Sequence, residues 1–272
     1  MKGSPAGNWA APLLLRNAPL RIDAGGAIAY SLKMNTKALV RVLYANVPGL
    51  AAARFALGDF LSPYASKPEY VGARLIRPGL IVEIGANRGQ SIAAFKRLSP
   101  GSTIVAFEPV PKAAARLAAK YKSNPAITVH DCALGERAGT ITLFVPRYGR
   151  WECDAVAATS YAEATAMFHN PARIALFDES KLTVAEYTVE QRTLDSYELA
   201  PTLIKLHAVG AEYAILKGAR HTILAHKPAL MCAFPTTAVT ELLSGWGYGP
   251  RVHSNAHGRG TFTWYLTTTD HS

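Results

Sequence analysis

The sequence has few cysteines and no long run of apolar residues. Its 272 residues include three cysteines, Cys132, Cys153 and Cys232, which are widely spaced and form no CxxC pair. An odd, scattered set suits neither a disulfide framework nor a zinc site, so we expect a reducing, cytoplasmic location. No stretch approaches the roughly 18 consecutive apolar residues that a membrane span requires. Near the N-terminus, Pro5 and Arg16 interrupt what would otherwise be the apolar core of a signal peptide, so we expect no secretory or transmembrane segment.

Acidic residues are also scarce. The chain has 19 Asp and Glu against 29 Lys and Arg, which gives a formal net charge of +10. With 49% hydrophobic and 18% charged residues, it is nevertheless too apolar to be disordered. The positive charge is concentrated in residues 1–77, where ten cationic side chains outweigh three acidic ones and give +7, while residues 78–272 carry +3. A basic segment favours an anionic partner such as nucleic acid or a membrane surface, but it does not define the fold.

The composition changes near Pro78, where we place a boundary. Residues 1–77 hold turn formers around two expected helices, Lys37–Ala45 and Leu50–Phe60, and we interpret them as a basic, partly helical N-terminal extension that packs on the rest. Residues 78–272 alternate short apolar runs with amphipathic stretches, which predicts an α/β domain with a doubly wound, parallel sheet. The expected strands are Leu80–Ile84, Thr103–Phe107, Ile127–Cys132, Ile141–Val145, Leu203–Leu206, Leu230–Phe234 and Thr261–Leu266. The expected helices are Gln90–Leu98, Lys112–Lys122, Ala211–Leu224 and Thr237–Trp246.

A long excursion over residues 146–190 interrupts this alternation, and its second half, residues 170–190, is expected to be irregular. Long connections in compact domains are commonly functional, so we interpret this one as a lid or a substrate loop. Its aromatic side chains can contact a sugar ring or a flat natural product. Alternatively, they serve only to pack the lid against the rest of the domain. These aromatic residues are Tyr148, Trp151, Tyr161, Phe168 and His169.

The most informative stretch is the turn after the first expected strand. Glu83 lies inside the strand, and Gly85 and Gly89 then flank a turn that opens a helix. Gly85 can let the backbone approach a ligand closely, and Gly89 can let the helix pack on the strand. A dinucleotide fingerprint would have glycine where this chain has Asn87 and Gln90, so pyrophosphate binding is disfavoured. Glu83 instead suits a cationic ligand.

The next two strands also end in polar residues. Glu108 follows the second strand about twenty residues beyond the glycine turn, where a carboxylate can accept both hydroxyl groups of an adenosine ribose. The third strand ends in Asp131, Cys132 and Ala133, which can form a wall for an adenine ring. The acidic first strand, the glycine turn, the second carboxylate and the polar end of the third strand together favour S-adenosylmethionine as the ligand.

Several short sequence motifs carry a resemblance to a known family. They are Glu83-Ile84-Gly85-Ala86-Asn87-Arg88-Gly89-Gln90, Phe107-Glu108-Pro109, Ala133-Leu134-Gly135, Arg192-Thr193-Leu194-Asp195, Leu203-Ile204-Lys205-Leu206, Gly210-Ala211-Glu212 and Leu216-Lys217-Gly218-Ala219. In order and spacing, residues 80–247 resemble the FkbM family of S-adenosylmethionine-dependent methyltransferases. The resemblance implies a Rossmann-like class I methyltransferase, with a central, mostly parallel seven-stranded sheet and helices on both faces. It also implies methylation of a hydroxyl on a sugar, glycan or natural product.

The expected cofactor-binding residues lie on the first three strands and the turns that follow them. They are Glu83, Gly85, Ala86, Asn87, Gly89, Gln90, Glu108, Pro109, Asp131, Cys132 and Ala133.

The chain departs from the family pattern beside the expected methyl-transfer pocket. Where the family usually reads Lys-Ile-Asp-Val-Glu-Gly-Ala-Glu, this chain has His207 in place of Asp and Val209 in place of the first Glu. At the end of the fifth strand, where an acidic residue is common in the family, the chain has Ala233. The missing carboxylates count against a carboxylate-held metal ion, so we expect none.

His207 is the main candidate for catalysis. It stands where the family's Asp faces the cofactor, and imidazole titrates near neutrality, so it can take the proton of an acceptor hydroxyl. The competing interpretation is that His207 fills space in a degraded site. Lys205 is a second candidate, expected to pair with Glu212 or with an acidic group of the substrate. His130 could reach the same rim but is expected to be structural.

The leading hypothesis is therefore an S-adenosylmethionine-dependent O-methyltransferase with a small-molecule or glycan acceptor. A nucleic-acid methyltransferase is disfavoured, because the basic residues are not interleaved with aromatic ones and no RNA-binding module is recognisable. An N- or C-methyltransferase of the same fold stays open, and peripheral membrane contact through the basic extension is a weaker hypothesis. The replacements at residues 207, 209 and 233 motivate a further alternative, a catalytically impaired cofactor-binding or scaffold protein.

Overall fold

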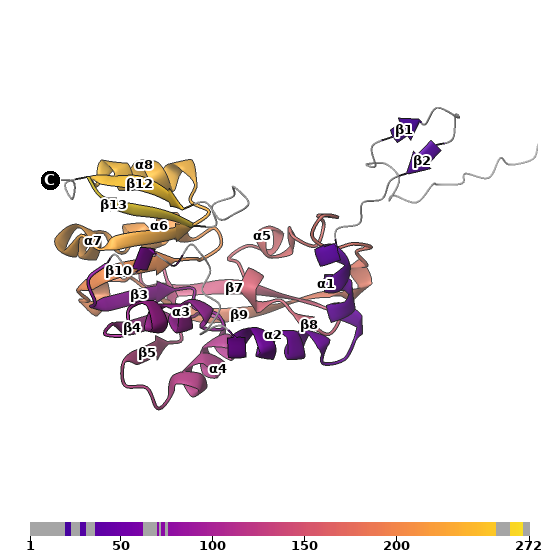
Figure 1. Cartoon of the computed structure of the whole chain (residues 1–272), viewed down its shortest axis with the longest axis horizontal. Coiled ribbons are helices and arrows are strands. Elements are labelled where there is room, and N and C mark those ends of the chain that lie inside the picture. Colours follow the sequence, from indigo (N-terminus) through magenta and orange to yellow (C-terminus); the bar gives the residue numbers. More distant parts are fainter. Residues whose placement is uncertain are drawn as a thin grey trace, which may run out of the picture.

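A computed structural model describes residues 20–22, 28–30, 36–61, 70, 72–73, 76–253 and 262–268 of the chain. Its centre is a seven-stranded sheet with the strand order β12-β13-β11-β10-β3-β4-β5 (Figure 1). The five parallel strands are β3 (Leu80–Ile84), β4 (Thr103–Phe107), β5 (Ile127–His130), β10 (Pro201–Leu206) and β11 (Ala229–Ala233). At one edge, β13 (Phe262–Thr267) pairs antiparallel with β11, and β12 (Tyr248–His253) pairs antiparallel with β13.

Helices cover both faces of this sheet, because its strands are apolar on both sides. Ile81 of β3 packs in one core cluster with α3 (Gln90–Leu98), and its neighbour Val82 packs on the opposite face. The second cluster is completed by α6 (Glu212–Lys217), α7 (Arg220–His226) and α8 (Thr237–Gly245). The sheet order and the two covered faces confirm the predicted fold class, a mostly parallel seven-stranded α/β sheet with helices on both faces.

A second, four-stranded sheet has the order β6-β9-β7-β8 and was not predicted. Its main part is the antiparallel pair of β7 (Gly139–Tyr148) and β9 (Leu182–Arg192), with β6 (Ala133–Leu134) and β8 (Trp151–Glu152) at the edges. The expectation that residues 170–190 are irregular is therefore wrong for the part that forms β9. Most β9 side chains are exposed or half-buried, so the strand lacks the apolar run that would reveal it.

The central sheet has the predicted number of strands, but one of the seven is not a strand that the sequence predicted for it. The run Ile141–Val145 belongs to β7 of the second sheet, and the seventh place is taken by β12, which was not predicted. The predicted strand Ile127–Cys132 ends at His130, and the predicted helix Ala211–Leu224 is divided into α6 and α7. The break falls at Gly218, where a Cβ atom would lie 1.9 Å from the carbonyl oxygen of Gly135.

The N-terminal segment contains the short strands β1 (Leu20–Ile22) and β2 (Ile28–Tyr30) and the two expected helices, α1 (Thr36–Asn46) and α2 (Leu50–Leu61). Ala45 of α1 and Ala51 of α2 are buried in a cluster with Tyr148 and Trp151 of the second sheet. The two helices therefore pack on the second sheet (Figure 1).

The remaining helical elements are α4 (Pro111–Tyr121), α5 (Tyr161–Thr165), η3 (Asp154–Val156), η4 (Glu179–Lys181) and η5 (Asp195–Tyr197). None of the helices in the described ranges combines the length and the apolar character that crossing a bilayer requires.

Candidate functional site

A cavity of about 440 Å³ opens at the carboxyl ends of β3, β4 and β10. Parallel α/β sheets bind ligands at this edge, and the volume lies within the roughly 300–1,000 Å³ of small-molecule sites. The opposite wall comes from residues 151–159, which contain β8 and η3. Part of the excursion identified in the sequence therefore lines the cavity.

Glu83 and Lys205 form a buried ion pair beneath the cavity. Lys205 Nζ lies 2.5 Å from Glu83 Oε1, and the Ser91 hydroxyl donates to the same oxygen over 2.8 Å. Burial raises the pKa of Glu83, and the ion pair with Lys205 opposes that rise. Glu83 Oε2 is buried and has no hydrogen-bond partner among the described residues. The expected pairing of Lys205 with Glu212 is wrong, because Lys205 pairs with Glu83. Glu212 Oε1 instead accepts a hydrogen bond from the backbone N–H of Ala208.

Two glycines of the β3–α3 turn are required by close approaches within the protein. Gly85 has φ +75°, and a Cβ atom there would lie 1.9 Å from the carbonyl oxygen of His207. Gly89 has φ +73°, and its Cβ would lie 2.6 Å from Leu117 of α4. Gly85 thus lets the end of β10 approach the turn, whereas the sequence pattern suggested that it makes room for a ligand. Gly89 lets α4 pack on the turn, whereas the pattern suggested that it lets the following helix pack on β3.

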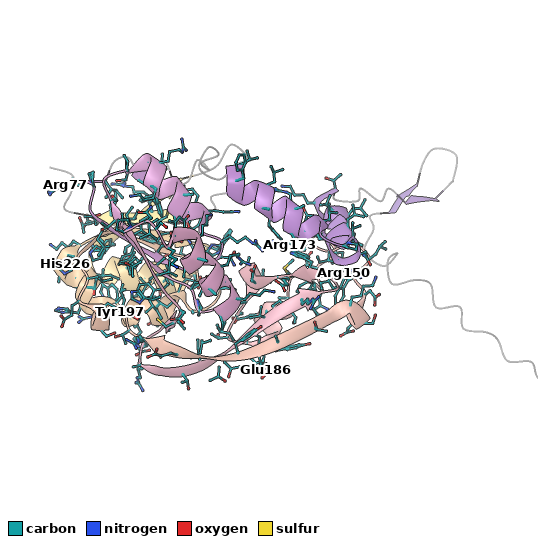
Figure 2. All side chains as sticks on the ribbon, turned by 90° about the horizontal axis from the view of Figure 1, so that it is seen from below. Arg77, Arg150, Arg173, Glu186, Tyr197 and His226 are labelled. Carbon is teal, nitrogen blue, oxygen red and sulfur yellow. The ribbon has the colours of Figure 1, made fainter. Side chains whose placement is uncertain are left out.

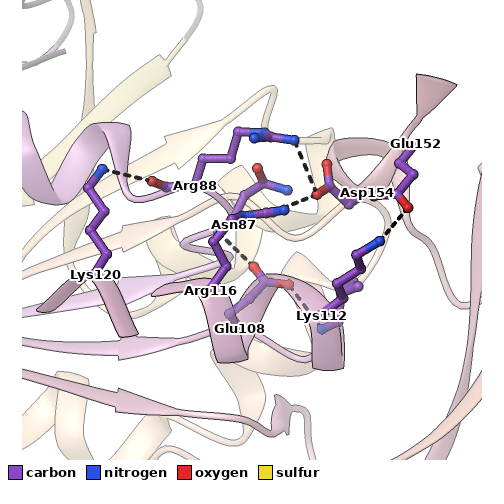
Figure 3. Close-up of polar contacts among 9 residues, drawn as sticks. Asn87, Arg88, Glu108, Lys112, Arg116, Lys120, Glu152 and Asp154 are labelled. Atoms are coloured by element: carbon purple, nitrogen blue, oxygen red, sulfur yellow. Dashed lines mark hydrogen bonds and ion pairs between the residues drawn. The ribbon is translucent and has the colours of Figure 1, made fainter. Parts of the chain in front are cut away.

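Glu108 is the buried carboxylate that the sequence predicted at the end of β4. Its side chain lines the cavity and is 3% exposed. Oε2 accepts a hydrogen bond from the Asn87 backbone N–H at 2.7 Å, and Oε1 accepts one from the Val110 N–H at 3.0 Å (Figure 3). Burial raises the pKa of Glu108, the two N–H groups lower it, and the negative charge of Asp154 raises it further. Each carboxylate oxygen keeps a lone pair, so Glu108 can accept two more hydrogen bonds.

Most of the predicted site residues come together around the cavity. The residues that line it are Gly85, Ala86, Asn87, Gln90, Glu108, Pro109, Cys132, Ala133, Lys205 and His207. Three predicted residues, Glu83, Gly89 and Asp131, are absent from the described lining. His130 stacks on Phe107 with ring centroids 5.0 Å apart, and burial lowers its pKa.

His207 follows β10 directly and lines the cavity beside Lys205. Its backbone N–H donates to the Ile84 carbonyl at 3.0 Å, which fixes the end of β10 against β3. The half-buried imidazole makes edge contacts with Phe234 and Phe262, at centroid distances of 6.3 and 5.7 Å. Among the described residues, no three His, Cys, Asp or Glu side chains lie close enough together to hold a metal ion.

A network of ion pairs, which was not predicted, connects the excursion to the β3–α3 turn and to α4. Asp154 Oδ2 of η3 lies 2.7 Å from an Arg116 nitrogen on α4 and 3.7 Å from one on Arg88 (Figure 3). Beside it, Lys112 pairs with Glu152. The basic residues at four-residue spacing on α4 were a signal for such a partner, although nothing in the sequence pointed to Asp154.

The N-terminal helices also contribute to the cavity wall. Arg41 of α1 and Phe55 of α2 line it, and the Arg88 guanidinium lies 4.2 Å above the Phe55 ring. From the excursion, Trp151 and Arg173 complete this side. Trp151 was one of the excursion aromatics considered for substrate contact or lid packing, whereas Arg41, Phe55 and Arg173 were not predicted as part of the site.

The strand order, the antiparallel edge and a glycine turn beside a cavity at the carboxyl ends of the strands define a Rossmann-like class I methyltransferase fold. The family model described as "Methyltransferase FkbM domain" matches residues 83–250, more than half of the sequence. The chain therefore belongs to the FkbM family of methyltransferases, as the sequence motifs indicated.

Several solved structures are similar to part or most of this chain. The FkbM methyltransferase from Methylobacillus flagellatus KT is 22% identical, with a TM-score of 0.48 over 72% of this chain and 47% of the other. The O-methyltransferase TomG from Streptomyces achromogenes, in complex with SAM, is 13% identical, with a TM-score of 0.40 over 87% of this chain and 99% of TomG. The chain thus spans about half the length of the Methylobacillus protein. A comparison with curated proteins finds no match.

Proposed function

We propose that this protein is an S-adenosylmethionine-dependent methyltransferase that methylates a hydroxyl group of a small molecule or glycan in the cytoplasm. The observation that carries the proposal is Glu108, a buried carboxylate that lines the cavity and keeps two lone pairs for a ligand. Burying a charged carboxylate is costly unless it is well bonded. A ribose diol would supply the two hydrogen bonds that the protein leaves unmade.

The residues around Glu108 fit the rest of the cofactor. Ala86, Asn87, Gln90 and Pro109 line the cavity on either side of the carboxylate. Cys132, Ala133 and Leu134 provide an apolar wall of suitable character for an adenine ring. The carboxylate of Glu108, which forms no ion pair in the described part of the chain, gives this end of the site a negative charge that suits a sulfonium. Bound S-adenosylmethionine supplies an electrophilic methyl group on that sulfonium.

Within the proposal, His207 acts on the acceptor. An imidazole nitrogen of His207 takes the proton of the acceptor hydroxyl, which typically contributes about 10²–10⁴-fold to the rate. The Lys205–Glu83 pair and the hydrogen bond from the His207 N–H to the Ile84 carbonyl hold the end of β10 in place, so Lys205 is a positioning residue. Residues 151–159 act as a lid that excludes water, and fixed positions of the reactants supply much of the remaining acceleration.

A second candidate, a cofactor-binding protein without turnover, is favoured by the replacements at His207, Val209 and Ala233. The two functions predict different results in one experiment. The protein is incubated with methyl-labelled S-adenosylmethionine and a panel of sugars, glycans and phenolic natural products, and the products are analysed by mass spectrometry. Label on an acceptor oxygen supports the O-methyltransferase. Tight cofactor binding with no label transferred to any acceptor, even from a host extract, supports the impaired protein instead.

A further inference from the structure

Two arginines from distant parts of the sequence meet at the cavity wall. Arg41 lies on α1 and Arg173 lies in the excursion, beside the N-terminal helices (Figure 2). Arg41 Nη1 donates a hydrogen bond to the backbone carbonyl of Arg173 at 3.0 Å. Partial burial and the nearby charge of Arg173 lower the pKa of Arg41. No carboxylate within the described ranges forms an ion pair with either arginine, so both positive charges are available to a ligand.

A second cavity, of about 490 Å³, adjoins the main one at this point. The two cavities share Arg41, Phe55, Gln90 and Trp151, so they form one groove. Lys37 and Arg54 also line the second cavity, and its described lining contains no Asp or Glu. A cleft lined by charges of one sign concentrates ligands of the opposite sign. This end of the groove is therefore suited to an anion, in contrast to the end that contains Glu108.

Trp151 gives an independent indication of a ligand in the groove. Its side chain is 8% exposed and forms part of the wall of both cavities. Its indole Nε1 is buried and has no hydrogen-bond partner in the described part of the chain. A buried donor left unpaired costs about 1–3 kcal/mol. An oxygen atom supplied by a ligand would satisfy it once the side chains that cover Nε1 in this structure move aside.

We propose that the cationic end of the groove binds a phosphate group on the methyl acceptor, so that the substrate is a phosphorylated hydroxyl compound. Arg41 and Arg173 contact the phosphate oxygens, since a guanidinium matches phosphate geometry with two parallel hydrogen bonds. Several cations around one groove favour a dianionic phosphate over a single carboxylate. This assignment rests on the proposed methyltransferase function, because it names the acceptor of that reaction.

The test uses pyrophosphate as the probe and the full chain saturated with S-adenosylhomocysteine, so that the cofactor part of the cavity is filled. Binding is measured by calorimetry for the wild type and for Arg41→Gln, Arg173→Gln and Trp151→Phe. Arg150→Gln is the matched control, because Arg150 is exposed near the same helices but lines neither cavity. Malonate replaces pyrophosphate in a parallel titration.

We expect each of the two arginine variants to weaken pyrophosphate binding about tenfold, which corresponds to losing one charge-assisted hydrogen bond. Trp151→Phe has a smaller effect in the same direction, Arg150→Gln has none, and malonate binds more weakly than pyrophosphate. The affinity for S-adenosylhomocysteine stays unchanged in the three arginine variants.

Several results would overturn the assignment. They are the absence of pyrophosphate binding at millimolar concentration, equal effects of Arg41→Gln and Arg150→Gln, and tighter binding of malonate than of pyrophosphate. A parallel loss of S-adenosylhomocysteine affinity in Arg41→Gln would instead assign the arginines to the carboxylate of the cofactor. If the wild type does not bind S-adenosylhomocysteine at all, the methyltransferase proposal fails. The pyrophosphate titration without cofactor then still reports on the anion site separately.

Discussion

Replacing Asp154 by Asn should loosen the contact that the excursion makes with the β3–α3 turn and with α4. The change keeps the size of the side chain but removes the charge that pairs with Arg116 at 2.7 Å and Arg88 at 3.7 Å. A hydrogen bond between charged groups is worth about 1.5–3 kcal/mol, but exposed pairs contribute only about 0.2–1 kcal/mol. The Asp154 side chain is 11% exposed and that of Arg116 is 34% exposed, so this pair lies between the two cases. We therefore expect a loss of about 1–2 kcal/mol in the free energy of unfolding.

The neighbouring pair supplies a matched control. Lys112 and Glu152 are 65% and 42% exposed, so Glu152→Gln should cost less than about 0.5 kcal/mol. For a protein of this size, Asp154→Asn should lower the melting temperature by about 2–6 °C. Hydrogen exchange should also become faster in residues 151–159. Equal melting temperatures for the two variants, or unchanged exchange in that segment, would refute the idea that Asp154 holds the excursion on the cavity.

Three further predictions concern the β3–α3 turn, the candidate base His207 and the carboxylate of Glu108 that is proposed to bind ribose. Gly85→Ala should lower the free energy of unfolding, measured with urea, by about 3 kcal/mol or more, because Gly85 has a left-handed φ and a Cβ atom there would collide with His207. The control Gly245→Ala lies at a position with open space, so it should not lower the free energy of unfolding by a comparable amount. His207→Gln should lower kcat about 10²–10⁴-fold and leave the affinity for S-adenosylhomocysteine unchanged; an unchanged kcat would exclude His207 as the base. Because the pKa of Glu108 is raised, folding favours its protonated form, so its contribution to stability should decline as the pH rises from the ordinary carboxyl range through the raised pKa. Ligand binding needs the ionised form, so affinity for S-adenosylhomocysteine should increase over the same pH interval in calorimetric titrations. A pH-independent affinity would contradict that role.

The features predicted from sequence are those encoded locally. The strands β3, β4 and β10 are apolar runs that end in polar residues, and this pattern alone indicates both the sheet and the position of Glu108. Most of the cofactor-binding residues predicted with the help of the family motifs line a single cavity in the structure. Gly85 was also identified, although the close approach it permits is to the end of β10.

The features that were missed depend on contacts between distant segments. Arg41 and Arg173 are 132 residues apart in sequence, and neither lies in a motif. Asp154 belongs to a short helical turn without apolar periodicity, so its role follows only from the position of α4. The strand β9 is largely exposed and shows no buried run, and its pairing with β7 is set by tertiary structure.

The central claim is that Glu108 binds the ribose of S-adenosylmethionine or its product. The most direct measurement is a calorimetric titration of S-adenosylhomocysteine into the wild type, Glu108→Gln and the control Glu190→Gln, whose side chain is exposed and 2.7 Å from Arg192. We predict tight binding by the wild type and by Glu190→Gln. Glu108→Gln should bind about 10–100-fold more weakly, because the ribose loses hydrogen bonds to a charged acceptor. Absence of binding by the wild type at millimolar ligand, or equal affinities for the wild type and Glu108→Gln, would contradict the account.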